Sequence, residues 1–175
     1  MPEIYQPSDD SYFLSDILKS QIKNKNIKCL DIGSGSGIQA QTLIDLGIAP
    51  ENIILTDINP DAVKYLKQKF PNSKVIHSDL FKSINHKYDL IIFNPPYLPE
   101  DKFDKEKDTT GGKKGSEIIN KFLKQAKKHL NKDSKIFLLT SSLTKGINFL
   151  DYRKKLLGKK KLFFEEIYVL GLTIK

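Results

Sequence analysis

Residues 27–37 read Ile-Lys-Cys-Leu-Asp-Ile-Gly-Ser-Gly-Ser-Gly, an apolar run that leads directly into three alternating glycines. An apolar run without strict alternation predicts a short strand that is covered on both faces, as in a parallel sheet. Glycines between such a strand and a helix at 38–46 let the backbone approach a ligand closely, beside the free N–H groups of the helix. This stretch therefore predicts the turn of a βα unit, with a ligand bound at that turn.

The same alternation of strand and helix continues along the chain. Further strands are expected at 52–57, 74–77, 88–93 and 135–140, and further helices at 8–22, 60–70, 118–130 and, briefly, 143–150. The last two strands, at 152–160 and 162–172, are separated by too few residues for a crossover helix, so they should pair antiparallel. We therefore expect an α/β fold, a doubly wound, seven-stranded and mostly parallel sheet with an antiparallel C-terminal edge.

The composition indicates one compact cytosolic unit. With 175 residues, 20.0 kDa and 39% hydrophobic residues, the chain can bury one substantial core, so a single domain over 1–175 is expected, with an N-terminal helix region at 1–26. Cys29 lies in an apolar run and should be a buried small hydrophobe, and no disulfide can form within the chain. No secretory leader and no run of eighteen apolar residues is found, so a cytoplasmic location without a membrane span is expected.

The net charge of +8 is unevenly distributed. Residues 121–161 contain thirteen basic and two acidic residues, which suits an acidic partner. However, Arg153 is the only arginine, whereas base readout favours the planar fork of arginine. A lysine-rich surface is also common as a merely solvating surface. The charge is therefore a weak indication of nucleic-acid binding.

Several polar residues fall where the expected strands end. Asp31, Gly33, Asp57, Asp79 and Asn94 all occupy such positions. In open α/β sheets, ligands bind beyond the carboxyl ends of the strands, near the point where the strand order reverses. An acid at the tip of the second strand, such as Asp57, reaches the ribose hydroxyls of a bound nucleoside. Each acid taken alone could instead cap the following helix.

The tetrapeptide Asn94-Pro95-Pro96-Tyr97 closes the expected strand 88–93. Each proline fixes φ near −65°, removes a backbone donor and pushes the preceding residue into an extended conformation. The Asn94 side-chain oxygen and the Pro95 carbonyl can then act as two acceptors for one planar NH2 group, on which the Tyr97 ring can stack. The alternative is an ordinary proline-punctuated strand end. We expect Asn94, Pro95, Pro96 and Tyr97 to form the catalytic site.

The spacing of the glycines helps to choose the cofactor. A dinucleotide site uses G-x-G-x-x-G, and here the third glycine comes one residue early. Asp31, two positions before the first glycine, would repel a pyrophosphate but could hold an ammonium group or face a sulfonium. S-adenosylmethionine carries both cations and no phosphate, and it is the expected cofactor.

With these motifs the chain resembles the class I S-adenosylmethionine-dependent methyltransferases, and within them the HemK-like N5-glutamine methyltransferases of translation release factors, archaeal and eukaryotic branch. The resemblance covers nearly the whole chain. Its motifs are Tyr5 to Ser11, Asp31 to Gly37, Thr56 to Pro60, Asn94 to Tyr97, and Gly111 to Gly115. The tetrapeptide is also shared by amino methyltransferases that act on adenine.

The resemblance implies a role for each matching residue. Gly33, Ser34 and Gly35 would line the methionine part of the cofactor, with Asp31 facing its amino end. Ser11 stands where the family usually has a threonine that contacts the cofactor. The nucleoside would be held by Asp57 with Ile58 at the ribose and by Asp79 with Leu80 at the adenine, and Asn94 would lie next to the cofactor as well as the acceptor.

The methyl acceptor and the partners remain open from the sequence. The resemblance implies that the methyl acceptor is the glutamine of the Gly-Gly-Gln motif in a release factor. It also implies that the partner is a small zinc-binding activator protein, which docks along a sheet edge. Some relatives methylate lysine, and an adenine amino methyltransferase or a non-catalytic cofactor-binding subunit are further alternatives. Residues 98–115 are expected to form a substrate loop. The three histidines and Cys29 show no metal-binding spacing, so no metal is expected.

Overall fold

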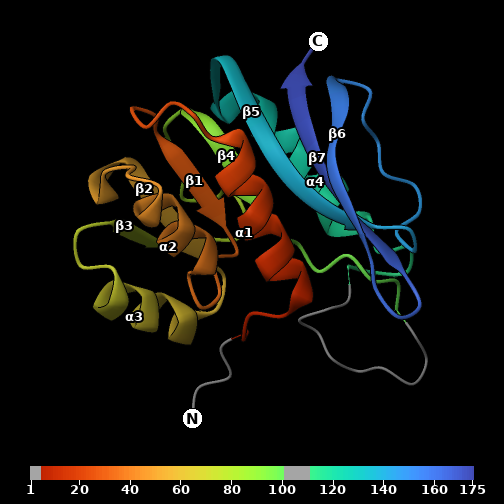
Figure 1. Cartoon of the computed structure of the whole chain (residues 1–175), viewed down its shortest axis with the longest axis horizontal. Helices are drawn as coiled ribbons and strands as arrows, with labels where there is room; N and C mark the ends of the chain where they lie inside the picture. Colours follow the sequence, from red (N-terminus) through yellow and green to blue (C-terminus); the bar gives the residue numbers. More distant parts are fainter. Residues whose placement is uncertain (1–4, 101–110) are drawn as a thin grey trace.

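A computed structural model describes residues 5–100 and 111–175. In these ranges seven strands form one sheet, in which the first five in spatial order are parallel and the last two run antiparallel to their neighbours (Figure 1). In spatial order the strands are β3 (Lys74–His77), β2 (Ile53–Asp57), β1 (Cys29–Ile32), β4 (Tyr88–Phe93), β5 (Leu130–Ser141), β7 (Glu166–Ile174) and β6 (Tyr152–Lys161). The expected fold class is confirmed, including the antiparallel C-terminal edge.

The strand order reverses between β1 and β4. From β1 the chain builds outward to β2 and β3, then returns to add β4 on the other side of β1. The register pairs Ile32 with Phe93, so Gly33 and Asn94 follow at neighbouring positions on the same sheet edge. This is the point at which open α/β sheets form a ligand crevice. Cys29 begins β1 and is fully buried, as expected, and burial raises the pKa of its thiol to about 12.

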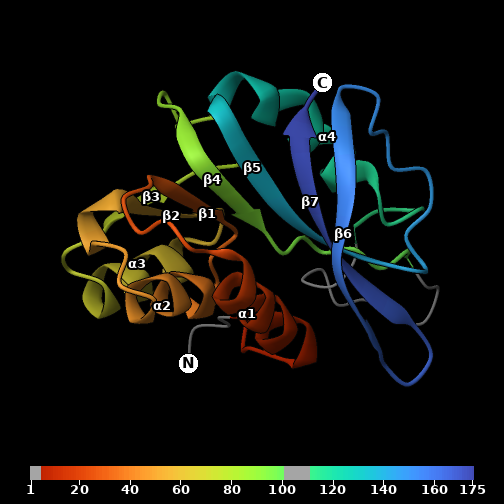
Figure 2. The ribbon, with the colours of Figure 1, turned by 45° about the horizontal axis from the view of Figure 1, so that its top comes forward.

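In the described part of the chain, four α-helices flank the sheet: α1 (Asp9–Gln21), α2 (Ile38–Asp45), α3 (Pro60–Lys69) and α4 (Glu117–Ala126). The ribbon views place α1 in front of the sheet and α4 behind it (Figures 1 and 2). The helix α3 begins as the sequence predicts, with Pro60 in its first turn and the Asn59 side chain accepting a hydrogen bond from the Asp61 N–H at 2.9 Å. The ring of Phe122 packs 4.6 Å from that of Phe93, so α4 is fixed against the strand that ends at the tetrapeptide.

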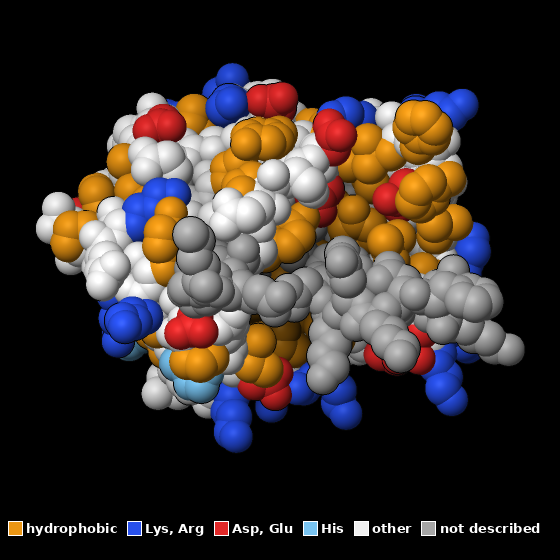
Figure 3. Space-filling view, turned by 90° about the horizontal axis from the view of Figure 1, so that it is seen from below, with side chains coloured by type: hydrophobic (Ala, Val, Ile, Leu, Met, Phe, Trp, Pro, Cys, Tyr) orange, Lys and Arg blue, Asp and Glu red, His pale blue; other side chains and the backbone are white. Residues whose placement is uncertain are grey.

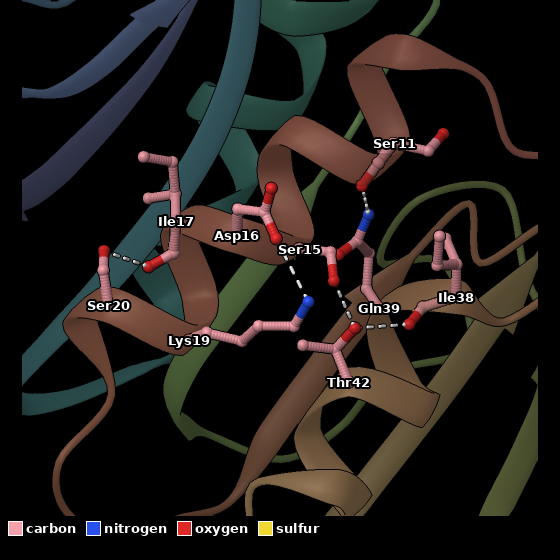
Figure 4. A network of polar contacts seen from close by, with 9 residues as sticks. All are labelled: Ser11, Ser15, Asp16, Ile17, Lys19, Ser20, Ile38, Gln39 and Thr42. Atoms are coloured by element: carbon pink, nitrogen blue, oxygen red, sulfur yellow. Dashed lines mark hydrogen bonds and ion pairs between the residues drawn. The ribbon is translucent and has the colours of Figure 1, made fainter.

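Buried polar contacts hold α1 against α2 (Figure 4). The Ser15 and Thr42 hydroxyl oxygens are 2.6 Å apart, and the Gln39 side-chain amide donates to the Ser11 carbonyl at 2.9 Å. Since α2 starts directly after the glycine turn, these contacts fix the N-terminal end of α1 beside that turn. None of the helices in the described ranges is both long and apolar enough to cross a membrane.

The expected helix at 143–150 is wrong. This segment contains no helix, because its backbone donors are bonded to other groups: the Leu143 N–H to the Ser141 hydroxyl and the Asn148 N–H to the Asn120 side chain. The strand β5 begins at Leu130, five residues before its predicted start at 135. The apolar pattern did not predict this extension because it contains exposed polar residues.

Candidate active site

A cavity of about 340 Å³ opens beyond the carboxyl ends of β1, β2 and β4. Figure 3 shows the molecule from the side at which these strands end, with hydrophobic side chains gathered toward the β6–β7 hairpin and basic ones mostly around the perimeter. Eight of the predicted site residues line the cavity: Gly33, Gly35, Asp57, Ile58, Asn94, Pro95, Pro96 and Tyr97. The other five do not: Ser11, Asp31, Ser34, Asp79 and Leu80.

The glycine turn is held in place by the tip of β2. Gly33 and Gly35 have φ values of 65° and 52°, in the left-handed region that favours glycine. The Gly35 N–H donates to the Asp57 carboxylate at 2.8 Å, and the other oxygen of that carboxylate accepts from the Asn59 N–H at 2.9 Å. Asp57 therefore braces the turn as well as lining the cavity. A carboxylate oxygen accepts more than one hydrogen bond, so both oxygens keep capacity for a ligand hydroxyl.

Asp31 lies beneath the glycine turn and is only 2% exposed. Its Oδ2 atom has no hydrogen-bond partner among the described residues. Burial, together with the nearby Asp57 carboxylate, raises the pKa of Asp31 to about 7. A buried carboxylate without a donor is costly, and a cation or N–H group from a ligand would relieve that cost. Such a carboxylate suits a cationic group chemically, but Asp31 does not line the cavity, and its contact with a cofactor stays a prediction.

Three other predicted cofactor residues have partners within the protein. The Asp79 carboxylate forms an ion pair with Lys121 at 2.7 Å. The Leu80 carbonyl accepts from the Ser78 hydroxyl at 2.9 Å, and Leu80 is buried with φ at 51°, a backbone conformation uncommon for a leucine. Ser11 is 1% exposed, and its hydroxyl donates to Asp10 at 3.1 Å. Their contact with a cofactor stays a prediction.

Asn94 presents one free acceptor at the cavity. Its Nδ2 atom donates to the Asp10 carboxylate at 3.1 Å, whereas its Oδ1 atom is buried and has no hydrogen-bond partner among the described residues. The Tyr97 hydroxyl donates weakly to the same Asp10 oxygen at 3.4 Å. Burial, and then the Asp10 charge, raise the pKa of Tyr97, so the phenol stays neutral. The ring of Tyr97 thus lies near the amide, with its hydroxyl tied to the protein.

Asp10 is the residue that the sequence did not single out. The sequence places it only near the start of the expected helix 8–22, yet it is 6% exposed and faces the end of β4. Burial alone would raise the pKa of Asp10, but hydrogen bonds from Ser8, Asn94, the Ser11 backbone and Tyr5 outweigh burial and lower it. The only available signal was its place in the Tyr5 to Ser11 motif.

The glycines at the end of the predicted substrate loop, which spans 98–115, pack against the tetrapeptide. The Gly111 N–H donates to the Leu98 carbonyl at 2.9 Å. A Cβ at Gly111 would lie 2.4 Å from the Pro96 carbonyl oxygen, and one at Gly115 would lie 2.3 Å from the Tyr97 carbonyl oxygen. Only glycine allows this approach. The role of 98–115 as a substrate loop stays a prediction, and residues 101–110 lie outside the described residues.

A larger cavity, of about 740 Å³, lies elsewhere and contains none of the predicted site residues. Its lining includes the start of β6 and the residues just after α1, with six basic side chains: Lys23, Lys132, Lys135, Arg153, Lys154 and Lys155. In the part of the chain that the structure describes, no group of three His, Cys, Asp or Glu side chains is placed to hold a metal ion.

Comparison with known proteins agrees with this architecture. Residues 9–162 match the model of the methyltransferase small domain family. The chain is 34% identical to a putative protein N5-glutamine methyltransferase of Methanocaldococcus jannaschii, over 97% of this chain and 91% of that protein. It is 32% identical to a release factor glutamine methyltransferase of Borreliella burgdorferi, over 75% of this chain but only about half (51%) of that protein.

A solved structure has the same fold. It is a chain of the E. cuniculi Mtq2–Trm112 complex, with a TM-score of 0.77 and 23% identity, covering 98% of this chain and 99% of that one. The family model spans all four helices and most of the sheet, and the archaeal relative matches nearly from end to end. The chain therefore belongs to the methyltransferase small domain family, and its relatives include protein N5-glutamine methyltransferases.

Proposed function

We propose that this protein transfers a methyl group from S-adenosylmethionine to the side-chain amide nitrogen of a glutamine, in the Gly-Gly-Gln motif of a translation release factor. One observation carries the proposal: Asn94 lines the same cavity as the glycine turn, and its buried Oδ1 atom has no hydrogen-bond donor among the described residues. An acceptor in that position suits an NH2 group of the substrate. The names of the two relatives support glutamine in a release factor as the acceptor.

The residues that line the cavity, and the buried Asp31 beneath its glycine turn, fit the cofactor. The unpaired Asp31 oxygen suits its ammonium group, the φ values of Gly33 and Gly35 allow a close backbone approach, and Asp57 keeps acceptor capacity for ribose hydroxyls. When bound, S-adenosylmethionine supplies a methyl group carried on positively charged sulfur. Asp79 with Leu80 at the adenine, Ser11 and Ser34 at the methionine end and Ile58 at the ribose complete the proposed cofactor site.

The chemistry requires orientation more than a base. An amide nitrogen is a poor nucleophile because its lone pair is delocalised into the carbonyl. Hydrogen bonds from the substrate NH2 to Asn94 Oδ1 and the Pro95 carbonyl would aim that nitrogen at the methyl group, while Pro96 keeps the turn rigid and Tyr97 covers the planar amide. Such positioning contributes up to roughly 7–11 kcal/mol in favourable cases. Burial of the site helps further, since charge disperses as the methyl group moves.

The surface around the cavity suits a macromolecular acceptor. The β6–β7 hairpin reaches the edge that holds the cavity, because β7 begins opposite the carboxyl end of β5, with Ile167 paired to Ser141. At its tip Phe163 is fully exposed and Phe164 is 76% exposed. Two solvent-exposed aromatic rings at the tip of this hairpin suit contact with a protein domain.

A labelled-methyl transfer assay tests the function. Release factor, its Gln-to-Ala variant and DNA are offered side by side, with equal enzyme and cofactor. Transfer to intact release factor alone is expected. Transfer to the Gln-to-Ala variant at the same rate would indicate another acceptor, such as lysine, and would refute the proposal.

A nucleic-acid amino methyltransferase is the second candidate. The six basic side chains around the larger cavity favour it, because clustered lysines attract phosphate groups. However, Arg153 is the only arginine in the chain, and that cavity contains none of the residues that line the proposed active site. Transfer to DNA or RNA, with none to release factor, would establish this candidate instead.

A small zinc-binding activator protein is the proposed partner. Among the described strands, β3 ends the sheet on one side, and its outer edge offers backbone groups for pairing with another chain. The solved structure with the same fold is also that of a complex, Mtq2–Trm112. Both partners would act in the cytoplasm, with the translation machinery. Co-expression should give a heterodimer that survives size-exclusion chromatography, and elution as separate proteins would contradict it.

A further inference from the structure

The two oxygens of Asp10 receive donors from two different parts of the chain. Oδ1 accepts from the Ser8 hydroxyl at 2.6 Å, the Tyr5 hydroxyl at 3.0 Å and the Ser11 N–H at 2.5 Å, all within the N-terminal segment. These contacts fix the carboxylate at the start of α1. The same side chain is thereby held against Asn94, which follows β4 and lies 84 residues later in the sequence.

The other oxygen faces the tetrapeptide. Oδ2 accepts from Asn94 Nδ2 at 3.1 Å and from the Tyr97 hydroxyl at 3.4 Å. An ionised carboxylate accepts hydrogen bonds and donates none, so it can only face the NH2 end of the Asn94 amide. The carbonyl end must then point the other way, where Oδ1 is buried without a partner.

We propose that Asp10 is a positioning residue that fixes the Asn94 amide with its carbonyl toward the methyl acceptor, and that it thereby restricts the site to acceptors bearing N–H groups. The inference rests on the proposed function, since it concerns the same site. A reversed amide would bring the Asn94 carbonyl against the Asp10 carboxylate, with two acceptors facing each other in a buried place. It would also aim an NH2 group at the substrate NH2 group.

The hydrogen bonds that Asp10 accepts argue against a role as a general base. Each oxygen of Asp10 already accepts at least two hydrogen bonds, from donors that remain in place without substrate. These hydrogen bonds lower the pKa of Asp10 despite its burial, which keeps the group ionised and a poor proton acceptor at neutral pH. Asp10 therefore contributes by orienting the Asn94 amide, and it does not take a proton from the substrate.

An exchange of the two side chains tests the pairing. In Asp10→Asn, the new NH2 group competes for the Asn94 carbonyl, so kcat with release factor should fall at least 30-fold while the Kd for the cofactor stays within threefold. In Asn94→Asp, two carboxylates face each other and kcat should also fall. The double variant Asp10→Asn/Asn94→Asp restores one donor and one acceptor, and kcat should recover at least tenfold over either single variant. Asp9→Asn, an exposed neighbour in the same turn, should match the wild type.

A second measurement does not depend on turnover. The NMR signals of the Asn94 side-chain NH2, identified by their loss in Asn94→Ala, should show one slowly exchanging proton in the wild type, and a shifted, faster-exchanging one in folded Asp10→Asn. Any one of three results would overturn the inference. The Asn94 signals could be unchanged in Asp10→Asn, the kcat of Asp10→Asn could lie within threefold of wild type, or the double variant could have a kcat no higher than that of Asp10→Asn. If the wild-type enzyme methylates no release factor but the Asn94 signal still shifts in Asp10→Asn, only the proposed function is refuted.

Discussion

Asp10 and Asp31 are two buried carboxylates at the same edge of the sheet, and the protein treats them in opposite ways. Asp10 is surrounded by donors from its own chain, which lower its pKa, whereas Asp31 has an oxygen without any donor among the described residues and a pKa raised to about 7. On the acceptor side of the site, the carboxylate therefore has its hydrogen bonds before a ligand arrives, and we call this the completed side, where only Asn94 Oδ1 is left without a donor among the described residues. The cofactor side is incomplete, and a cationic ligand would complete it.

The largest expected effect comes from breaking the completed side. Asn94→Ala removes the free acceptor but leaves the glycine turn and Asp31 untouched. Methyl transfer at saturating cofactor should fall by about 10²–10³-fold, as for the loss of one preorganised hydrogen-bonding group in other active sites. The Kd for S-adenosylmethionine, measured by calorimetry, should change by less than about threefold. Turnover equal to wild type would remove Asn94 from the mechanism.

The sequence predicts which residues form the two sides of the site, but it does not predict how the Asn94 amide is oriented. The glycine turn, the strand Tyr88–Phe93 and the tetrapeptide that ends it are local patterns, and the structure has them at the predicted residues. The direction of the Asn94 amide was not predictable, because it depends on a contact with Asp10 across 84 positions of sequence. Propensity and spacing contain no information about such a contact.

The failed helix has the same explanation. Residues 143–150 were predicted to form a short helix, but the Asn148 N–H is bonded to Asn120 and the Lys145 N–H to the Lys114 carbonyl. Both partners lie near or within α4, more than twenty-five residues earlier. A tertiary contact decided the conformation where the local preference was weak.

The second prediction breaks the cofactor side. Asp57→Ala removes the acceptor of the Gly35 N–H and the proposed ribose contact together. The Kd for the cofactor should rise by about 10–100-fold, because hydrogen bonds to a charged group contribute about 1.5–3 kcal/mol. Calorimetry measures this change, and NMR of the Asn94 side chain should show the acceptor side intact. A Kd within threefold of wild type would show that the glycine turn needs no brace.

The third prediction concerns the pH dependence of cofactor affinity, which should come from Asp31 on the cofactor side. The raised pKa means that Asp31 is protonated in the folded protein at pH 5.5 and largely ionised above pH 7, and a cationic ligand prefers the ionised form. Wild-type affinity for S-adenosylmethionine should therefore rise by roughly tenfold between pH 5.5 and 7.5, whereas Asp31→Asn should show little change. Calorimetry at the two pH values gives both slopes.

The pH dependence of the free energy of unfolding provides a control for the prediction about Asp31. Because the folded-state pKa lies above the ordinary value, the wild-type free energy of unfolding should decrease as pH rises from about 4 to 7. Asp31→Asn removes that decrease, so without ligand the variant should be the more stable protein at pH 8. Parallel stability curves for the two proteins would contradict the raised pKa.

The smallest effect is expected next to Asp10, at Asp9. Its carboxylate is 70% exposed and forms an ion pair with Lys160 at 2.6 Å. Exposed ion pairs contribute about 0–1 kcal/mol, so Asp9→Asn should lower the free energy of unfolding by less than about 1 kcal/mol, measured by urea denaturation, and leave methyl transfer unchanged. Asp9 and Asp10 carry the same charge in the same helical turn. If Asp9→Asn slowed transfer as much as Asp10→Asn, the negative charge of that turn would be what matters, and the hydrogen bond from Asn94 would not.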